Sequence, residues 1–116
     1  MATLEELGHP AGFEGVEALE DYMTTPPAAL VRDLAAVEGD IAVLGAGGKM
    51  GPTLARLAQR AAPDRTVYAV ARFTESAVRG ALEAAGARTV TADLLDPAAA
   101  ARLPDAANVL YLVGQK

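Results

Sequence analysis

From residue 41 onward, apolar residues occur in short blocks, and these blocks predict strands that alternate with helices. The first block, Ile41 to Leu44, is the kind of run that a strand buried on both faces of a parallel sheet requires. Three later blocks, rich in β-branched residues and leucine, predict further strands. The four predicted strands span residues 41–45, 66–72, 88–93 and 107–114.

Between these strands, apolar residues recur at three- and four-residue intervals, which predicts helices. One helix is expected over 49–62, and a second between Thr74 as its N-cap and Gly86 as its terminator. Asp96 predicts the N-cap of a short alanine-rich helix that Pro104 ends. The predicted buried faces are Leu54, Leu57, Ala58 and Ala61 in the first helix and Val78, Ala81, Leu82 and Ala85 in the second.

The first 40 residues predict helices only. Glycine and proline interrupt residues 1–25, where Val16, Leu19 and Met23 form a short, imperfect helical stripe, so we expect an N-terminal helical arm there. A threonine of the Thr24-Thr25-Pro26-Pro27 sequence is then expected to cap a helix with proline in its first turn, ending near Gly39. The predicted buried stripe of this helix is Leu30, Val31, Leu34 and Ala35.

Strands that alternate with helices through short loops predict βαβ units, parallel pairing and right-handed crossovers. We therefore expect an α/β fold, a Rossmann-type doubly wound parallel sheet with strand order 3-2-1-4. The expected organisation is an acidic arm over 1–25 and a Rossmann domain over 26–116. The ligand crevice of such a sheet lies at the carboxyl ends of strands 1 and 4, where the winding direction switches.

Charge is distributed unevenly along the chain. Residues 1–40 contain nine acidic residues and one arginine, whereas residues 41–116 contain six acidic and nine basic residues, which together give the net charge of −5. The positive part would suit a polyanionic cofactor, and two ordinary solvated surfaces are the alternative. A net acidic chain without clustered basic residues argues against a nucleic-acid partner. The absence of cysteine excludes a thiolate metal site, and we predict no metal site of any kind.

No stretch approaches the ~18 consecutive apolar residues of a transmembrane helix. The N-terminus carries Glu5 and Glu6 where a signal peptide would have basic residues. These features predict a soluble cytoplasmic protein without a membrane partner.

A glycine cluster follows the first strand, with Gly45, Gly47, Gly48 and Gly51 placed before an amphipathic helix. Helix N-termini leave N–H groups unpaired, and glycines let a pyrophosphate approach the backbone closely. The dinucleotide pattern G-x-G-x-x-G would need glycine at Met50, so the spacing that fits is G-x-x-G-x-x-G.

This turn, Gly-Ala-Gly-Gly-Lys-Met-Gly, resembles the fingerprint Gly-Ala-Thr/Gly-Gly-Phe-Ile/Leu-Gly of the extended short-chain dehydrogenase/reductase family, which includes the NAD-dependent epimerases and dehydratases. Lys49 stands where the family has an aromatic residue. The backbone N–H groups around Gly48, Lys49 and Met50 are expected to face the pyrophosphate. Lys49 would either add a charge to a phosphate or be an exposed lysine at a helix start.

The resemblance also implies where the rest of a dinucleotide would lie. Arg72 matches the arginine that ends the second strand in many NADP-using relatives, so NADP is favoured over NAD. Alternatively, Arg72 stacks on the adenine without any preference for the 2′-phosphate. Asp93 and Leu94 match an Asp-Leu pair at the adenine, although an aspartate that caps a turn is the competing interpretation. Gly114 matches the small residue that lies against the adenosine ribose.

The catalytic pair of this family, Tyr-x-x-x-Lys, is not found in this chain. The residues four positions after the three tyrosines are Pro26, Arg72 and Gln115. In the family this pair lies beyond the fourth strand, so we assign no catalytic residue. The resemblance thus implies that this chain supplies only the first half of the fold, an incomplete Rossmann domain over 26–116, and is the N-terminal part of a longer protein. The function predicted first is the NAD(P)-binding portion of an epimerase, dehydratase or reductase whose small-molecule substrate is unknown.

Two other functions stay open on the sequence. One is a non-catalytic regulatory domain that binds NAD(P), as atypical members of the family allow. The other is a half-fold that assembles through strand 4, an apolar edge that would pair with a second copy or another chain.

Overall fold

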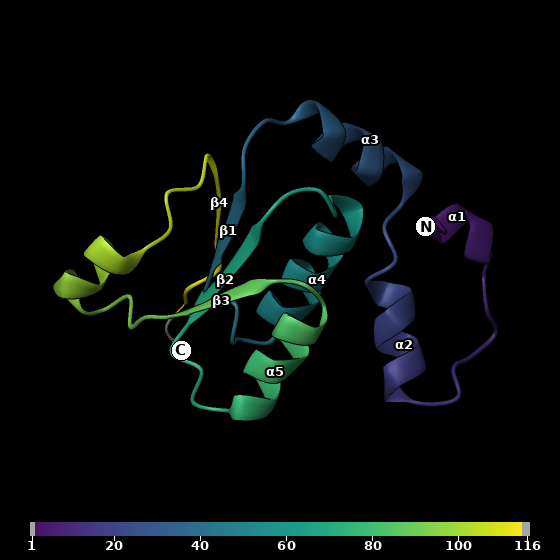
Figure 1. Ribbon diagram of the computed structural model, residues 1–116. Helices are drawn as coiled ribbons and strands as arrows, with labels where there is room; N and C mark the ends of the chain where they lie inside the picture. Colours follow the sequence, from purple (N-terminus) through teal and green to yellow (C-terminus); the bar gives the residue numbers. More distant parts are fainter. Residues whose placement is uncertain (1, 115–116) are drawn as a thin grey trace.

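A computed structural model of the protein describes residues 2–114. Helices and strands alternate from β1 onward, as the sequence predicts (Figure 1). In chain order the elements are α1 (Leu4–Leu7), α2 (Val16–Met23), α3 (Ala28–Ala36), β1 (Ile41–Leu44), α4 (Gly51–Ala61), β2 (Val67–Ala71), α5 (Ser76–Ala84), β3 (Arg88–Thr91), the 3₁₀ helix η1 (Pro97–Arg102) and β4 (Asn108–Tyr111). Within residues 2–114, no helix is both long and apolar enough to span a membrane.

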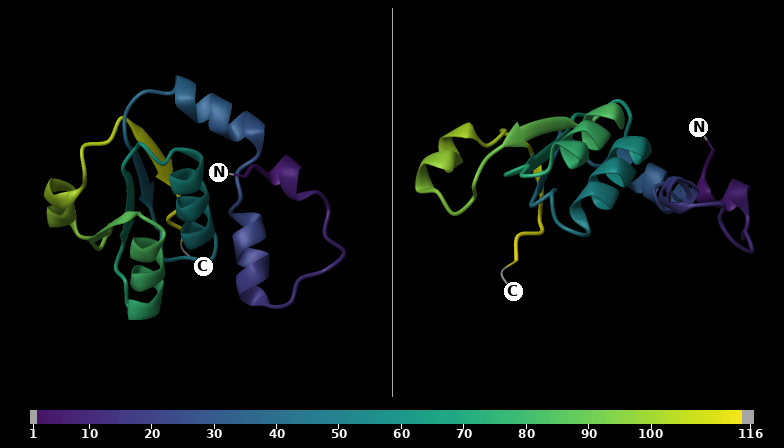
Figure 2. Two further views of the ribbon diagram at one scale, coloured as in Figure 1. Left: turned by 45° about the vertical axis from the view of Figure 1, so that its right-hand side comes forward. Right: turned by 90° about the horizontal axis from the view of Figure 1, so that it is seen from below.

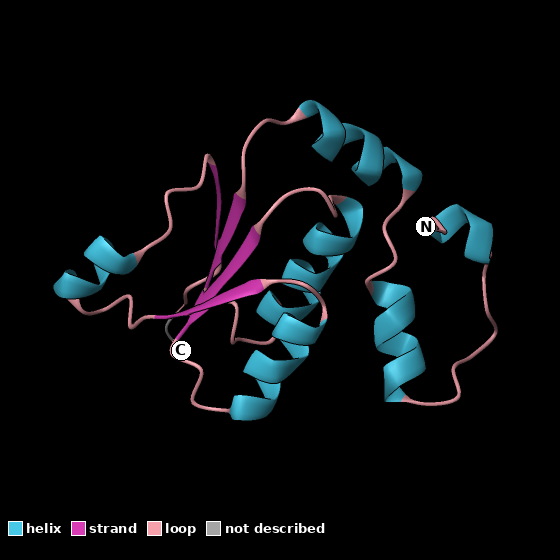
Figure 3. Ribbon diagram, in the orientation of Figure 1, coloured by secondary structure: helices cyan, strands magenta, loops and turns pink. Residues whose placement is uncertain are grey.

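The four strands form one all-parallel sheet in the order β3-β2-β1-β4 (Figure 3). Ile41 at the start of β1 pairs with Val67 of β2 and with Asn108 of β4, so three strands begin at the same level. This confirms the predicted α/β class and strand order, and the arrangement is Rossmann-like.

The two faces of the sheet are covered differently. On one face, α4 and α5 pack on β1 and β2 in a core that includes Val43, Ala55, Ala69 and Leu82. On the other face, η1 contributes Ala99 to a smaller core with residues from the strands and the segments that follow them. The small side chains of alanine let the helix backbones lie close to the sheet.

The contact face of α4 differs from the one predicted. Ala55, Ala58 and Ala61 are buried, whereas Leu54 and Leu57 are only half-buried. The helix touches the sheet through its small residues, so the two leucines flank the contact instead of filling it. In α5, Leu82 is buried, but the predicted core residue Ala81 is exposed.

The helix-start predictions were partly wrong, because long-range contacts replace local caps. Thr24 and Thr25 donate their hydroxyls to the carbonyls of Glu20 and Asp21 at 2.8 Å each, so they close α2 and do not open α3. Pro27 is the N-cap residue of α3. None of the predicted stripe of α3 is fully buried, because this helix lies at the end of the sheet and not over a face (Figure 1).

Three further residues were predicted to begin or end helices, and two of them do. Thr74 does not cap α5; Glu75 occupies that position without a side-chain hydrogen bond. Gly86 does end the helix, since its φ is +97° and the Gly86 and Ala87 N–H groups bond to carbonyls of the last turn, a Schellman motif. Asp96 is the predicted cap, accepting a hydrogen bond from the Ala98 N–H at 3.0 Å, although the helix it opens is a 3₁₀ helix.

The N-terminal helices α1 and α2 lie at the end of the molecule opposite η1 (Figures 1 and 2). The Arg60 guanidinium of α4 donates to the Asp21 carbonyl at 2.9 Å and to the Thr24 hydroxyl at 2.8 Å, which fastens the end of α2 to α4. At the start of α3, the Ala28 N–H donates to the Glu5 carboxylate at 2.9 Å. That hydrogen bond lowers the pKa of Glu5 below its ordinary 4.5.

Candidate functional site

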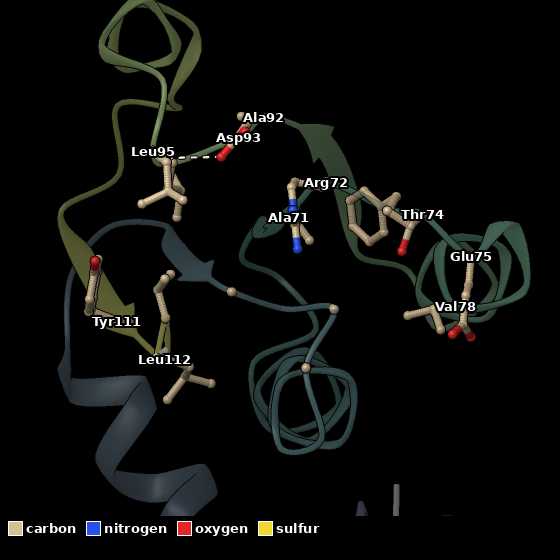
Figure 4. Close-up of a pocket in the computed structure, with 17 residues that line it drawn as sticks. Ala71, Arg72, Thr74, Glu75, Val78, Ala92, Asp93, Leu95, Tyr111 and Leu112 are labelled. Carbon is tan, nitrogen blue, oxygen red and sulfur yellow. Dashed lines mark hydrogen bonds between the residues drawn. The ribbon is translucent and has the colours of Figure 1, made fainter. Parts of the chain in front are cut away.

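A cavity of about 620 Å³ opens at the carboxyl ends of the four strands (Figure 4). Its walls come from the turn after β1, the β2–α5 corner, the segment after β3 and the end of β4. This is the place where neighbouring strands of an open parallel sheet are followed by connections of opposite direction, and its volume is typical of a small-molecule site. The lining residues are Gly45, Gly47, Gly48, Ala71, Arg72, Phe73, Thr74, Glu75, Val78, Ala92, Asp93, Leu94, Leu95, Tyr111, Leu112, Val113 and Gly114.

Two glycines of the turn are required by the fold itself. Gly45 has a φ of +89°, and a Cβ there would lie 3.0 Å from the carbonyl carbon of Leu112. A Cβ on Gly51 would lie 2.5 Å from the Cα of Ala46, so only glycine lets α4 begin this close to the turn. These positions hold β1, β4 and α4 together around the cavity.

The other two glycines, Gly47 and Gly48, are exposed at the cavity wall. A Cβ on Gly48 would meet only the Gly45 carbonyl oxygen, at 3.7 Å, so this position is open. A Cβ on Gly47 would lie 3.2 Å from the Cβ of Ala71, a tighter contact. A ligand can therefore approach the backbone at Gly48 more closely than at a position with a side chain.

We expected the N–H groups around Gly48 to be free to face a pyrophosphate, and one of them is already hydrogen-bonded within the turn. The Gly48 N–H donates to the Gly45 carbonyl at 3.3 Å and is thus partly engaged. Within residues 2–114, no protein acceptor bonds to the N–H groups of Gly47, Lys49 or Met50. Together with the N–H groups of Gly51 and Thr53 in the first turn of α4, which likewise have no acceptor in this part of the chain, these donors are left for an anion.

Three of the predicted site residues, Lys49, Met50 and Gly51, lie outside the cavity lining. The side chains of Lys49 and Met50 are exposed, and Gly51 is buried beneath the turn. The structure brings together the other seven: Gly45, Gly47, Gly48, Arg72, Asp93, Leu94 and Gly114.

Arg72 follows β2 and is exposed at the cavity, between Asp93 on one side and Thr74 and Glu75 on the other (Figure 4). No hydrogen bond or ion pair within the described part of the chain engages its guanidinium. Arg60, by contrast, pairs with the carboxylate of Asp21 at 3.1 Å. Arg72 is thus a cation at the cavity with all its donors available.

Asp93 caps the turn after β3, because one of its carboxylate oxygens accepts from the Leu95 N–H at 3.0 Å. Turn capping was the alternative to adenine binding in the sequence prediction. Asp93 can do both, because its second carboxylate oxygen has no protein donor within residues 2–114. Leu94 is half-buried against the smaller core, whereas Leu95 is 85% exposed.

Sequence reasoning missed much of the lining. The residues not predicted are Ala71, Phe73, Thr74, Glu75, Val78, Ala92, Leu95, Tyr111, Leu112 and Val113. Most directly follow or end a strand, so a rule that all four strand ends meet at one edge would have found them. Val78 lies on α5 and carries no such signal.

The groups assembled at the cavity can bind a charged ligand. The guanidinium of Arg72 lies at the wall with the carboxylates of Glu75 and Asp93, among aliphatic and aromatic side chains, and the backbone donors of the turn after β1 lie at the edge. Among the described residues, no group of three or more histidine, cysteine, aspartate or glutamate side chains is placed to hold a metal ion. Comparisons with models of protein families, with curated proteins and with solved structures found no match to this chain.

Proposed function

We propose that this protein binds the dinucleotide NADP, or NAD, in a doubly wound Rossmann-type site of the short-chain dehydrogenase/reductase kind. The observation that carries the proposal is the turn after β1. An open glycine, Gly48, and the unengaged N–H groups of Gly47, Lys49 and Met50 lie at the start of α4, at the edge of a cavity formed by all four strand ends.

The residues around the cavity fit the parts of a dinucleotide. The pyrophosphate would lie at the turn, where a Cβ on Gly48 would occupy the open space. The uncommitted oxygen of Asp93 would accept from the adenine amino group beside Leu94. Gly114, at which an added Cβ meets no atom within 4 Å, would leave room for the adenosine ribose.

Arg72 favours NADP over NAD in this proposal. Its donors are unengaged, and a 2′-phosphate would supply the missing acceptor. A charge-assisted hydrogen bond contributes roughly 1.5–3 kcal/mol, which corresponds to about 10- to 150-fold in affinity. Because Arg72 is exposed, we expect the lower part of this range and a loss of preference at high salt.

The chain's role in the proposed function is to bind and orient the cofactor, and none of the described residues is assigned a catalytic role. When bound, the nicotinamide ring would supply hydride transfer. The relatives implied by the resemblance are epimerases, dehydratases and reductases, and the cavity does not distinguish among their substrates.

Calorimetric titration of the purified protein with NADPH and with NADH at low salt tests the proposal. We expect both to bind, NADPH about tenfold more tightly, and Arg72→Ala to remove that difference. Gly48→Ala should abolish binding of both nucleotides without loss of stability. A folded protein that binds neither nucleotide would contradict the proposal.

A second candidate function, self-association, is favoured by one observation at β4. Within the described residues this strand pairs only with β1, and Val109, Leu110 and Tyr111 are 55%, 39% and 66% exposed. The strand contains neither charge nor proline, the usual devices that prevent an edge from pairing. A second copy could extend the sheet there.

A further inference from the structure

The corner between β2 and α5 contains an unusual backbone conformation. Phe73 has a φ of +51°, and it is the one residue other than glycine with a positive φ among residues 2–114. This left-handed region is disfavoured for any side chain with a Cβ, and bulky residues seldom occupy it. Strain of this kind persists only where the surrounding structure holds it in place.

The phenyl ring of Phe73 makes the contact that holds this backbone conformation in place. Phe73 is half-buried and packs against the core that α4 and α5 form on the sheet. The chain has only residues 72–75 in which to leave β2 and enter α5. The left-handed turn at Phe73 lets the chain change direction within this short connection while the ring packs against the core at the cavity wall.

The backbone of Arg72 is held in place by the residue before it and the residue after it. Before it, Ala71 is buried and paired with Thr91, and its carbonyl accepts from the Ala92 N–H at 2.9 Å. After it, Phe73 is anchored by its ring. Since the guanidinium itself has no protein partner within the described residues, its approach to the cavity depends on this backbone.

We infer that Phe73 is a positioning residue for Arg72 and that discrimination between phosphorylated and unphosphorylated ribose depends on it. The inference rests on the proposed function, because it concerns how the same cavity recognises a 2′-phosphate. Phe73 acts through the backbone and not by touching the 2′-phosphate. It sets the direction in which the preceding residue presents its cation.

The test compares the Kd for NADPH with the Kd for NADH in four variants that change Phe73 and in Arg72→Ala as the reference. Phe73→Gly removes the ring and frees the backbone, whereas Phe73→Val keeps an apolar side chain but resists a positive φ. Both should reduce the ratio of the Kd for NADH to the Kd for NADPH roughly tenfold, to the level of Arg72→Ala. The ratio is the readout because Phe73 also lines the cavity, so a loss of affinity shared by both nucleotides cancels from it. Phe73→Leu, the matched control, keeps an apolar anchor of similar size and should retain the preference. In the double variant, Arg72→Ala with Phe73→Gly, the preference should equal that of Arg72→Ala alone.

The outcomes separate this inference from the proposal on which it rests. Wild-type protein that is folded and binds neither nucleotide overturns the proposed function. Wild-type protein that binds both equally removes the 2′-phosphate contact, and this inference with it, but leaves dinucleotide binding intact. An unchanged preference in Phe73→Gly and Phe73→Val overturns the inference alone. So does an equal weakening of both nucleotides, which would show that Phe73 only stabilises the fold; circular dichroism of each variant verifies that it is folded.

Discussion

Replacing Gly51 by alanine tests how closely α4 packs on the glycine-rich turn. An alanine Cβ would lie 2.5 Å from the Cα and 2.6 Å from the carbonyl carbon of Ala46, and 2.6 Å from the Gly45 oxygen. Ordinary contacts of a Cβ are 3.4–4 Å. All three neighbours are backbone atoms, so no side chain can rotate away, and the start of α4 must move by about 1 Å.

The size of the effect follows from that movement. Overpacking a well-packed site costs typically 1–3 kcal/mol, and the upper part of this range applies because Ala46 and Ala55 beside the site are completely buried. Alanine recovers less than ~1 kcal/mol of helix propensity at a first-turn position. We expect Gly51→Ala to lower the free energy of unfolding by about 2 kcal/mol, which shifts the midpoint of thermal unfolding by roughly 10 °C.

Urea unfolding followed by circular dichroism measures this change, and Gly48→Ala is the matched control. A Cβ on Gly48 meets nothing closer than 3.7 Å, so its unfolding free energy should stay within about 0.5 kcal/mol of the wild type. Gly48→Ala should instead abolish nucleotide binding. Unchanged stability in Gly51→Ala, or equal destabilisation by both substitutions, would refute the close packing deduced from the turn.

Other substitutions probe single features. Gly80→Ala should stabilise the protein by about 0.5–1 kcal/mol in urea unfolding, because Gly80 lies within α5 and an added Cβ meets no atom within 4 Å; any destabilisation would contradict this. Because the pKa of Glu5 is lowered, its cap on α3 should be fully present above pH 4.5 and lost as the pH falls through the lower, folded-state pKa. In an NMR pH titration, the chemical shift of the Ala28 amide should change with this transition, and the change should be absent in Glu5→Gln. A midpoint at or above pH 4.5 would rule out the cap. Leu110→Lys should abolish any concentration-dependent rise in mass seen by analytical ultracentrifugation, and self-association unaffected by it would exclude β4 as the interface.

The features that the sequence predicted well are those with local causes. The order of strands and helices follows from hydrophobic periodicity, and parallel pairing follows from strands joined by helices. Gly86 and Asp96 end or begin their helices through hydrogen bonds to residues within four positions along the chain. Periodicity thus predicted the alternation of elements, and the doubly wound arrangement of such units predicted the strand order and the edge of the sheet at which the cavity lies.

The predictions that failed concern competition between contacts distant in the sequence. Thr24 and Thr25 have the capping chemistry expected of them, but a carboxylate 23 residues before Ala28 takes the N-terminus of α3 instead. Periodicity gave α4 an apolar face that includes Leu54, yet the alanines determine how closely the helix approaches the sheet.

The candidate site likewise combines features that follow from the sequence with features that depend on the fold. The sequence by itself determined the glycine cluster, the cation Arg72 and the carboxylate Asp93, because residue type and position after a strand are enough to specify them. Only the tertiary structure decided which glycines support the fold and which are open, and that Phe73 adopts a left-handed conformation. The physical reason is that folding brings distant residues together. These neighbours determine how much free space surrounds a backbone atom and which contacts compensate local backbone strain.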